Sequence, residues 1–245
     1  MRETLRAHKE PEQTSPATRG RRSRWFFLGV SGALLAAVLV GFARTFYLRG
    51  LFDVPPIPVY LYLHGVVLTT WFALVFVQAC LVAAHRTDLH RRLGLLAAVV
   101  AVLVVLVSTV VVVRAAPTFA ASGLDSAQAQ FVIIGDLISL ALFAAFVATG
   151  VRMRRQSDWH KRFMVVASIV IVLPAIARLE RLGVAVPVPA VLLFLLIVLA
   201  VHDLVTSRRI HRATMWSSLL VLIALGATLL VAGSAVGQAV MNALR

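Results

Sequence analysis

Long apolar runs separated by short basic stretches dominate the chain after residue 24. A helix rises about 1.5 Å per residue, so about 20 apolar residues cross the roughly 30 Å hydrocarbon core of a bilayer. The pattern predicts seven spans: Trp25–Ala43, Ile57–Ala84, Leu93–Val113, Ala127–Val151, Trp159–Ala177, Pro187–Val205 and Thr214–Val236. The fifth fits the criterion least well, because its uncharged part, Phe163–Ala177, is short and depends on basic flanks that snorkel to the interface.

Composition supports a membrane protein and excludes several other classes. The hydrophobic set makes up 60% of the 245 residues and charged residues 14%, whereas soluble domains are about 45–50% apolar and about 25% charged. One cysteine excludes a disulfide-stapled secreted module. A soluble nucleic-acid binder carries net positive charge, here +14, but has no use for so much continuous apolar sequence. We therefore expect an all-α bundle of seven transmembrane helices.

The basic residues predict how this bundle is oriented. Of the 24 lysines and arginines, 18 lie in the N-terminal segment and in the loops after the second, fourth and sixth spans, and six lie on the other side. Cytoplasmic loops of membrane proteins carry an excess of such residues. The rule predicts a cytoplasmic N-terminus and an outer C-terminus, with anionic lipid headgroups as neighbours of the basic face and no nucleic-acid partner. Residues 1–24 are polar and predicted to be a disordered tail, and residues 25–245 form the transmembrane domain.

A seven-residue motif occurs twice, 70 residues apart. Thr87–Leu93 reads TDLHRRL and Ser157–Phe163 reads SDWHKRF, each where a helix leaves the cytoplasm. A looser copy precedes the seventh span. Repeated helical hairpins are the natural explanation, as in some transporter folds. Thr87 and Ser157 are good N-caps, and the basic pair suits a cytoplasmic loop, so capping and topology account for everything except the histidine.

Four histidines fall near the cytoplasmic face: His90, His160, His202 and His211. Histidines at one depth on different helices are how a bundle holds a haem or a metal ion, and the neighbouring arginines suit haem propionates. Asp203 is a carboxylate that would orient a ligand imidazole. None of the spacings between these histidines is a specific metal signature. Their shared depth and their charged neighbours make the four histidines candidate ligands for haem b or a metal ion.

Ionisable residues also occur in the outer half of the predicted bundle. His64 and Asp136 lie at similar depths in the second and fourth spans, and His64, Trp71 and Gln78 share one helix face. A charge in the hydrocarbon is costly, so these groups are expected to face inward and to have partners. With Arg44 and Arg178 at the outer ends of two spans, they predict a polar cavity in which Asp136 pairs with His64 or Arg178. A binding or proton-handling site and a pair that only fixes packing both remain open.

The combination of these motifs resembles a family of bacterial multi-span membrane proteins whose function is uncharacterised. The residues that carry the resemblance are Arg44-Thr45-x-Tyr47, His64-Gly65, Trp71, Gln78, Leu89 to Gly94, Asp136, His160 to Arg162, Pro174 to Arg178, Asp203 and Arg209-x-His211-x-x-Thr214-x-Trp216. The resemblance implies a multi-pass protein of the bacterial cytoplasmic (inner) membrane and brings no activity with it. The turn that contains His90 is also loosely similar to turns in b561-type cytochromes. A two-haem relay needs a histidine pair at each of two depths, and the outer half offers His64 alone, which disfavours two haems.

Three functions remain as hypotheses. The first, which the sequence favours over the other two, is a haem- or metal-binding redox or sensory protein that uses the four inner histidines. The second is a proton-coupled transporter whose outer cavity is lined by His64, Asp136, Arg44 and Arg178. The third is a structural or accessory subunit. The sequence has neither a phosphate-binding glycine loop nor a hydrolase motif, so no catalytic residue is assigned.

Overall fold

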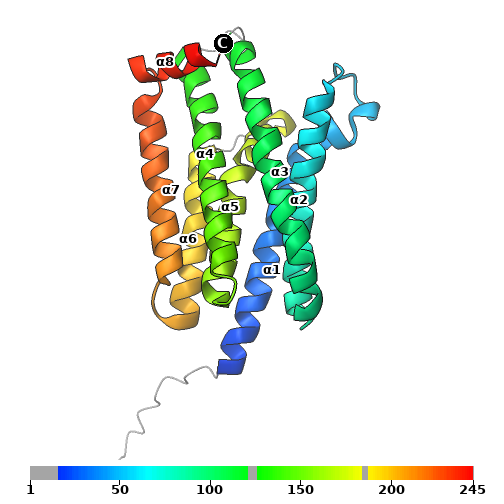
Figure 1. Cartoon of the computed structure of the whole chain (residues 1–245), viewed down its shortest axis with the longest axis vertical. Helices are drawn as coiled ribbons and strands as arrows, with labels where there is room; N and C mark the ends of the chain where they lie inside the picture. The colour runs from blue at the N-terminus through cyan, green and yellow to red at the C-terminus, as the bar shows by residue number, and fades with distance from the viewer. Residues whose placement is uncertain (1–15, 121–125, 184–186, 245) are drawn as a thin grey trace, which may run out of the picture.

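The computed structural model describes residues 16–120, 126–183 and 187–244 as an elongated bundle of helices that run side by side (Figure 1). The long helices are α1 Pro16–Gly41, α2 Val59–Ala83, α3 Thr87–Ala120, α4 Ser126–Arg152, α5 Ser157–Ala177, α6 Val188–Ser207 and α7 Arg212–Val231. Short elements are η1 Ala43–Tyr47, η2 Arg49–Leu51, η3 Arg178–Leu182 and α8 Ala235–Ala243. Seven helices in the described part are long and apolar enough to cross a membrane, which confirms the predicted all-α transmembrane bundle.

The fifth span, the least convincing in the sequence, forms the centre of the bundle. Of the best apolar window of α5, 56% is buried inside the protein, against 33% or less for every other span. Helix α1 packs closely on α5, where a Cβ added at Gly41 would collide with the carbonyl oxygen of Ala175. Other helices thus cover more of α5 than of any other span. A helix in this position therefore tolerates a shorter apolar stretch and charged residues at its end.

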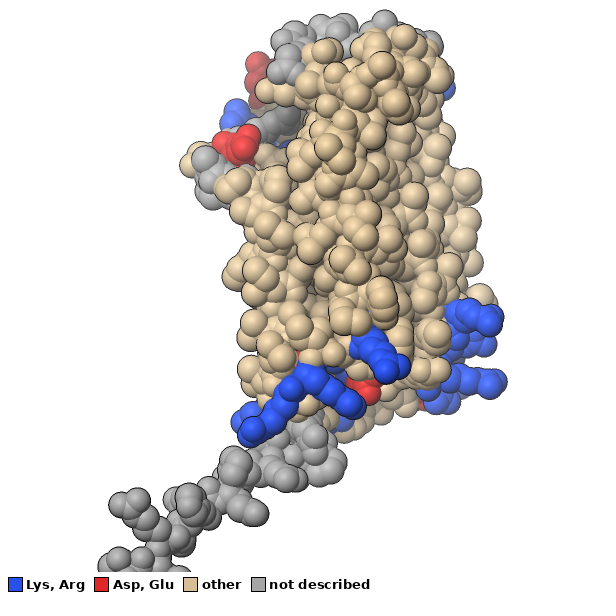
Figure 2. Space-filling model, turned by 90° about the vertical axis from the view of Figure 1, so that its left-hand side faces the viewer, with Lys and Arg blue, Asp and Glu red and all other residues tan. Residues whose placement is uncertain are grey.

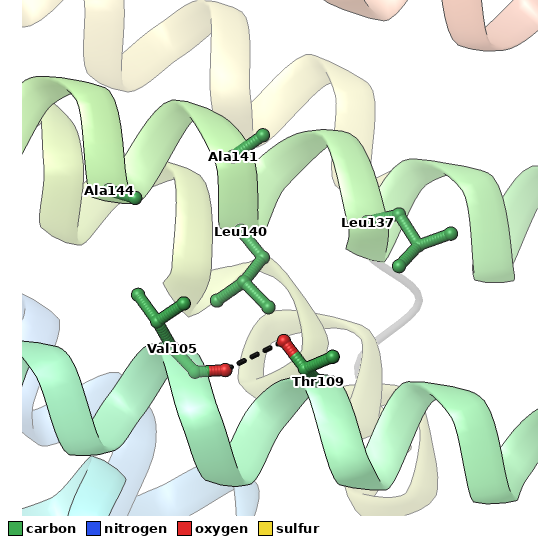
Figure 3. A pocket seen from close by; sticks show the side chains of 6 residues that line it. All are labelled: Val105, Thr109, Leu137, Leu140, Ala141 and Ala144. Atoms are coloured by element: carbon green, nitrogen blue, oxygen red, sulfur yellow. Dashed lines mark hydrogen bonds between the residues drawn. The ribbon is translucent and has the colours of Figure 1, made fainter.

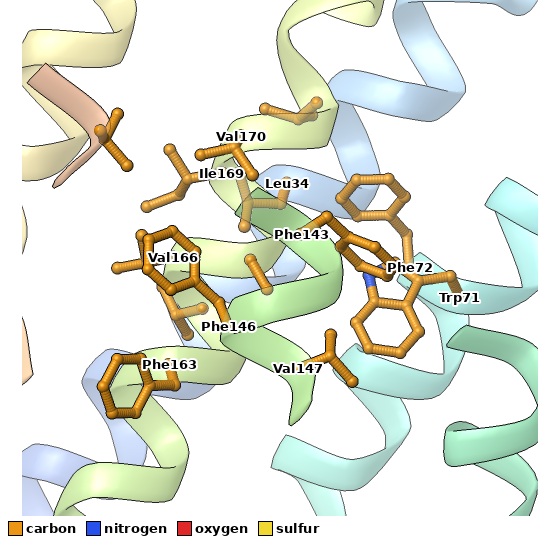
Figure 4. Packing of buried hydrophobic residues seen from close by; sticks show 14 of the residues in the cluster. Leu34, Trp71, Phe72, Phe143, Phe146, Val147, Phe163, Val166, Ile169 and Val170 are labelled. Carbon is orange, nitrogen blue, oxygen red and sulfur yellow. The ribbon is translucent and has the colours of Figure 1, made fainter. Parts of the chain in front are cut away.

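An aromatic core ties α2, α4 and α5 together (Figure 4). Trp71 is fully buried, packs edge-to-face on Phe143 with ring centroids 4.9 Å apart, and donates its indole N–H to Ser168 Oγ at 3.2 Å. Phe72 and Phe146 fill the space on either side. The prediction that the Trp71 face of the second span points inward is therefore confirmed at its central residue.

Several predicted boundaries need correction. Helix α1 begins at Pro16, so residues 16–24 are helical and the predicted disordered tail is too long; residues 1–15 lie outside the described part. Helix α3 extends from Thr87 to Ala120, beyond both predicted ends, because its flanking residues continue the helix into the interfaces. The predicted seventh span ends at Val231, and a separate amphipathic helix, α8, lies across the end of the bundle (Figure 1).

Charge divides the two ends of the bundle. On the face shown in Figure 2, lysine and arginine side chains gather at the end where α1 begins, and the surface between the two ends is uncharged. We call this the inner end and the opposite one the outer end, after the orientation that the positive-inside rule predicts. The start of α1 lies at the inner end and α8 lies at the outer end (Figure 1).

Candidate functional site

A buried ion pair connects α5 to α6 at the inner end. Asp203 is fully buried and Arg162 is 4% exposed. Arg162 donates from Nε to both carboxylate oxygens of Asp203, at 3.2 and 3.3 Å, and also from Nη2. Thr214 Oγ1 and the backbone N–H of His211 donate to Asp203 Oδ2 at 2.6 and 3.1 Å. The carboxylate of α6 thus accepts from α5 and from the start of α7, and the ends of these three helices meet around it.

The ion pair continues towards α1. Arg162 Nη1 donates to the backbone oxygen of Asp158 at 2.8 Å, and Lys161 Nζ lies 2.6 Å from Asp158 Oδ1. Lys161 also donates to Ser23 Oγ on α1 at 2.9 Å. We call Asp158, Lys161, Arg162, Asp203 and Thr214 the inner network. Sequence reasoning treated Arg162 as a topological charge and missed its buried role; the available signal was Asp203, a carboxylate within an apolar span that requires a partner.

His202 and His211 lie against the inner network. The His202 ring stacks on Phe26, with centroids 3.8 Å apart, and its Nδ1 is 3.6 Å from Asp203 Oδ1, beyond hydrogen-bond distance. His211 caps α7, since its Nδ1 accepts from the N–H of Ala213 at 3.1 Å. Partial burial and the nearby Arg162 guanidinium lower the pKa of the His211 imidazole, which favours the neutral form that this cap requires.

His90 and His160 form a second, separate pair between α3 and α5. Their ring centroids are 6.1 Å apart and the rings are nearly perpendicular. The four histidines predicted as ligands are thus divided between two places, His90 with His160 and His202 with His211. Within the described ranges, no group of three or more His, Cys, Asp or Glu side chains is placed to hold a metal ion. The expectation of one site that uses all four histidines is therefore not supported.

At the outer half, polar groups from four helices come within electrostatic reach of one another. His64 Nδ1 on α2 lies 3.4 Å from Ser108 Oγ on α3. Arg178, at the end of α5, interacts electrostatically with both His64 and Asp136 of α4. We call these residues, His64, Ser108, Asp136 and Arg178, the outer cluster. Ser108 is a member that sequence reasoning missed, because one serine in an apolar run carries no signal of its own.

The two arginines predicted to join this cluster behave differently. Arg178 places its guanidinium 4.4 Å from the centre of the Phe42 ring and donates to the Pro174 carbonyl at 2.8 Å. Arg44 is exposed on η1, with its guanidinium 5.1 Å from the centre of the Phe52 ring. The inclusion of Arg44 is therefore not supported, because the helical turn of η1 carries its side chain to the surface.

A shallow, open apolar groove lies at the same depth as the outer cluster, between α3 and α4 (Figure 3). Its volume is about 210 Å³, and its lining is Val105, Thr109, Leu137, Leu140, Ala141 and Ala144. The Thr109 hydroxyl donates to the Val105 carbonyl at 2.8 Å, so it is satisfied within its own helix. This groove is apolar, and none of the four residues of the predicted outer polar cavity lines it.

The two aspartates differ in the chemistry available to them. Asp203 accepts several hydrogen bonds, and protonating it would break them. For Asp136, no hydrogen bond to the carboxylate occurs among the described residues, and its electrostatic partner is Arg178. Comparisons of the chain with protein-family models, with curated proteins and with solved structures gave no match.

Proposed function

We propose that this integral membrane protein is a proton-coupled carrier whose working groups are the outer cluster. The observation that carries the proposal is the convergence of His64, Asp136 and Arg178 from three spans in the outer half of the bundle. Ionisable residues within the hydrocarbon region are costly to insert, and they mark proton and substrate pathways in pumps and transporters. The placement of these ionisable residues near one another favours a working site over helix packing alone.

Each member of the outer cluster has a distinct role in this proposal. Asp136 is the group that takes up and releases the proton. His64, held by Ser108, is a second acceptor, and Arg178 supplies the positive charge that compensates ionised Asp136. The division of the inner histidines between two places makes a shared haem site a weaker explanation. By the resemblance and the excess of arginine over lysine, we propose the bacterial cytoplasmic membrane as its location.

The test is proton flux into proteoliposomes. The protein is reconstituted with an internal pH dye, and a potassium diffusion potential drives protons inward. We expect Asp136→Asn to reduce the flux at least tenfold, and His64→Gln to reduce it less, because it leaves the primary acceptor intact.

Asp53→Asn is the matched control, since Asp53 is an exposed carboxylate in the connection between α1 and α2. It is expected to leave the flux unchanged. Equal flux in wild type and Asp136→Asn, with both proteins melting at the same temperature, would overturn the proposal.

A further inference from the structure

The paired histidines at the inner end are equivalent residues of the duplicated motif. His90 is the fourth residue of α3, and His160 is the fourth residue of α5. The structure brings these two equivalent positions together, with ring centroids 6.1 Å apart and ring planes at 87°. Helix capping explains the Ser/Thr and Asp of the motif, and membrane topology explains its basic residues. Neither accounts for the histidine, so its pairing needs its own explanation.

Backbone carbonyls orient both rings. His160 Nδ1 lies 2.8 Å from the carbonyl oxygen of Gly150 on α4, which fixes the proton on Nδ1 and leaves the Nε2 lone pair available. The His90 ring interacts with the backbone of Gln78 on α2. Such bonds from one ring nitrogen to a carbonyl are what orients histidines that ligate metals through the other nitrogen.

Two buried polar atoms at this place have no partner in the described structure: His90 Nδ1 and Gln78 Oε1. A buried acceptor without a partner costs free energy, and native structures contain few of them. The two atoms belong to neighbouring residues, because the backbone of Gln78 contacts the His90 ring. An uncompensated ring nitrogen beside a second, pre-oriented imidazole is the feature that points to a ligand.

We propose that His90 and His160 bind a soft monovalent metal ion, Cu⁺, as a two-histidine site. The pair is not suited to Zn²⁺, which takes four ligands, because the described residues offer no third His, Cys, Asp or Glu. Charge also favours a monovalent ion. The acid nearest in sequence, Asp88, pairs with Arg86 at 3.5 Å, and Arg91 adds positive charge beside His90.

The neighbouring side chains suit copper in this oxidation state. Imidazole is a good copper ligand, and a thioether selects Cu⁺ over harder ions. The sulfur of Met164, one turn after His160, packs against Gly150, where an added Cβ would lie 3.0 Å from it. The carbonyl group of Gly150 therefore orients the His160 ring. Because Gly150 has no side chain, the Met164 sulfur can pack against it. The inferred site joins the inner ends of α2, α3, α4 and α5, and it is separate from the outer cluster.

The experiment is an anaerobic Cu⁺ titration of the purified, tag-free full chain in detergent against a chromophoric Cu⁺ chelator. Because Cys80 is the chain's one thiol, all variants carry Cys80→Ser. We expect one equivalent of Cu⁺ to bind, and His90→Ala or His160→Ala to weaken binding at least tenfold. His85→Ala is the matched control, since His85 is exposed on the same inner loop, and it is expected to change nothing.

A second measurement does not depend on whether the variants fold. X-ray absorption of the Cu⁺-loaded Cys80→Ser protein is expected to show two nitrogen donors with at most one sulfur. The proposal is overturned if Cu⁺ is not retained against the chelator, if His85→Ala weakens it as much as His90→Ala, or if Zn²⁺ binds more tightly with the same histidine dependence. Proton flux through the outer cluster is measured without copper, so either proposal fails independently of the other.

Discussion

Asp203 and Asp136 both lie within membrane-spanning helices, but their carboxylates differ in hydrogen bonding. Asp203 accepts hydrogen bonds from the side chains of Arg162 and Thr214 and from the backbone of His211. Asp136 interacts electrostatically with Arg178, and no hydrogen bond to its carboxylate occurs among the described residues. The same side chain is thus fully bonded at the inner end and sparsely bonded in the outer half.

Under the proposed function, this difference separates a structural charge, Asp203, from a proton-carrying one, Asp136. A buried carboxylate with several donors fixes the geometry of its partners, and removing one partner strands a charge in a low-dielectric interior. A carboxylate with an electrostatic partner and no described hydrogen bond depends less on fixed geometry, and under the proposed function its protonation state changes. We therefore expect mutations at Asp203 to alter stability and mutations at Asp136 to alter activity.

The largest expected effect is that of Asp203→Asn. It removes the buried counter-ion of Arg162 and leaves the exposed carboxylate of Asp158, 3.4 Å from Arg162 Nη1, as the remaining one. Breaking a buried pair costs about 3–5 kcal/mol. Thermal melting in detergent measures the loss. The double variant Arg162→Met, Asp203→Leu tests the reason, since replacing both charges by apolar groups is expected to cost less than either single change. A double variant as unstable as the sum of the single variants would show that the pair does not act as a unit.

The two copies of the motif show how far the sequence predicts this arrangement. Arg92 and Arg162 occupy the same motif position, yet Arg92 is exposed and Arg162 is buried. Apolar periodicity predicts the seven helices because each must span the bilayer, whatever its neighbours. Burial of one arginine depends on which helix lies at the centre, and α5 is central although its uncharged stretch, Phe163–Ala177, is short. That placement follows from packing between distant segments, which local patterns do not encode.

The sequence also predicts the candidate sites only in part. The sequence identifies His64, Asp136 and Arg178 because ionisable residues stand out in an apolar span, and the structure places them within electrostatic reach. It does not reveal how the four inner histidines group, since helix rotation decides whether His90 faces His160 or the lipid. Arg44 shows the same limit, because the helical turn of η1 directs its side chain to the surface.

A smaller loss of stability is expected for Thr214→Val, which keeps the shape of the side chain and removes one donor to Asp203. Its hydroxyl donates at 2.6 Å to a charged group, and such bonds contribute about 1.5–3 kcal/mol. Thermal melting relative to wild type measures the change. Ser217→Ala is the control, because the Ser217 hydroxyl bonds only to backbone carbonyls of its own helix. Equal effects of the two variants would show that Asp203 gains nothing particular from Thr214.

At Asp136 the comparison predicts an almost unchanged melting temperature. Asp136→Asn removes no described hydrogen bond, and it withdraws a charge from the membrane interior, so we expect the free energy of unfolding to change by less than about 1 kcal/mol. The measurement is the same melting experiment, made on the protein used for proton flux. A loss as large as that of Asp203→Asn would mean that Asp136 is also a structural charge, and the distinction between the two aspartates would fail.

The smallest expected effect concerns pH and His211. Partial burial and Arg162 lower the pKa of His211, although Asp203 and Asp158 act in the opposite direction. The folded chain therefore binds a proton at His211 less readily than the unfolded chain, for which the usual pKa is near 6.5. The contribution of neutral His211 to the free energy of unfolding is therefore fully present above that pH. It is expected to fall slightly as the pH drops through that value, and to level off once folded His211 is also protonated.

His211→Asn keeps an N-capping side chain but cannot titrate, so its melting temperature should depend less on pH between 7.5 and 5 than that of wild type. Taking the difference between variant and wild type cancels the contribution of the other histidines. His85→Asn, at an exposed histidine, should retain the wild-type profile. If His211→Asn also retains it, protonation at His211 does not weaken the start of α7.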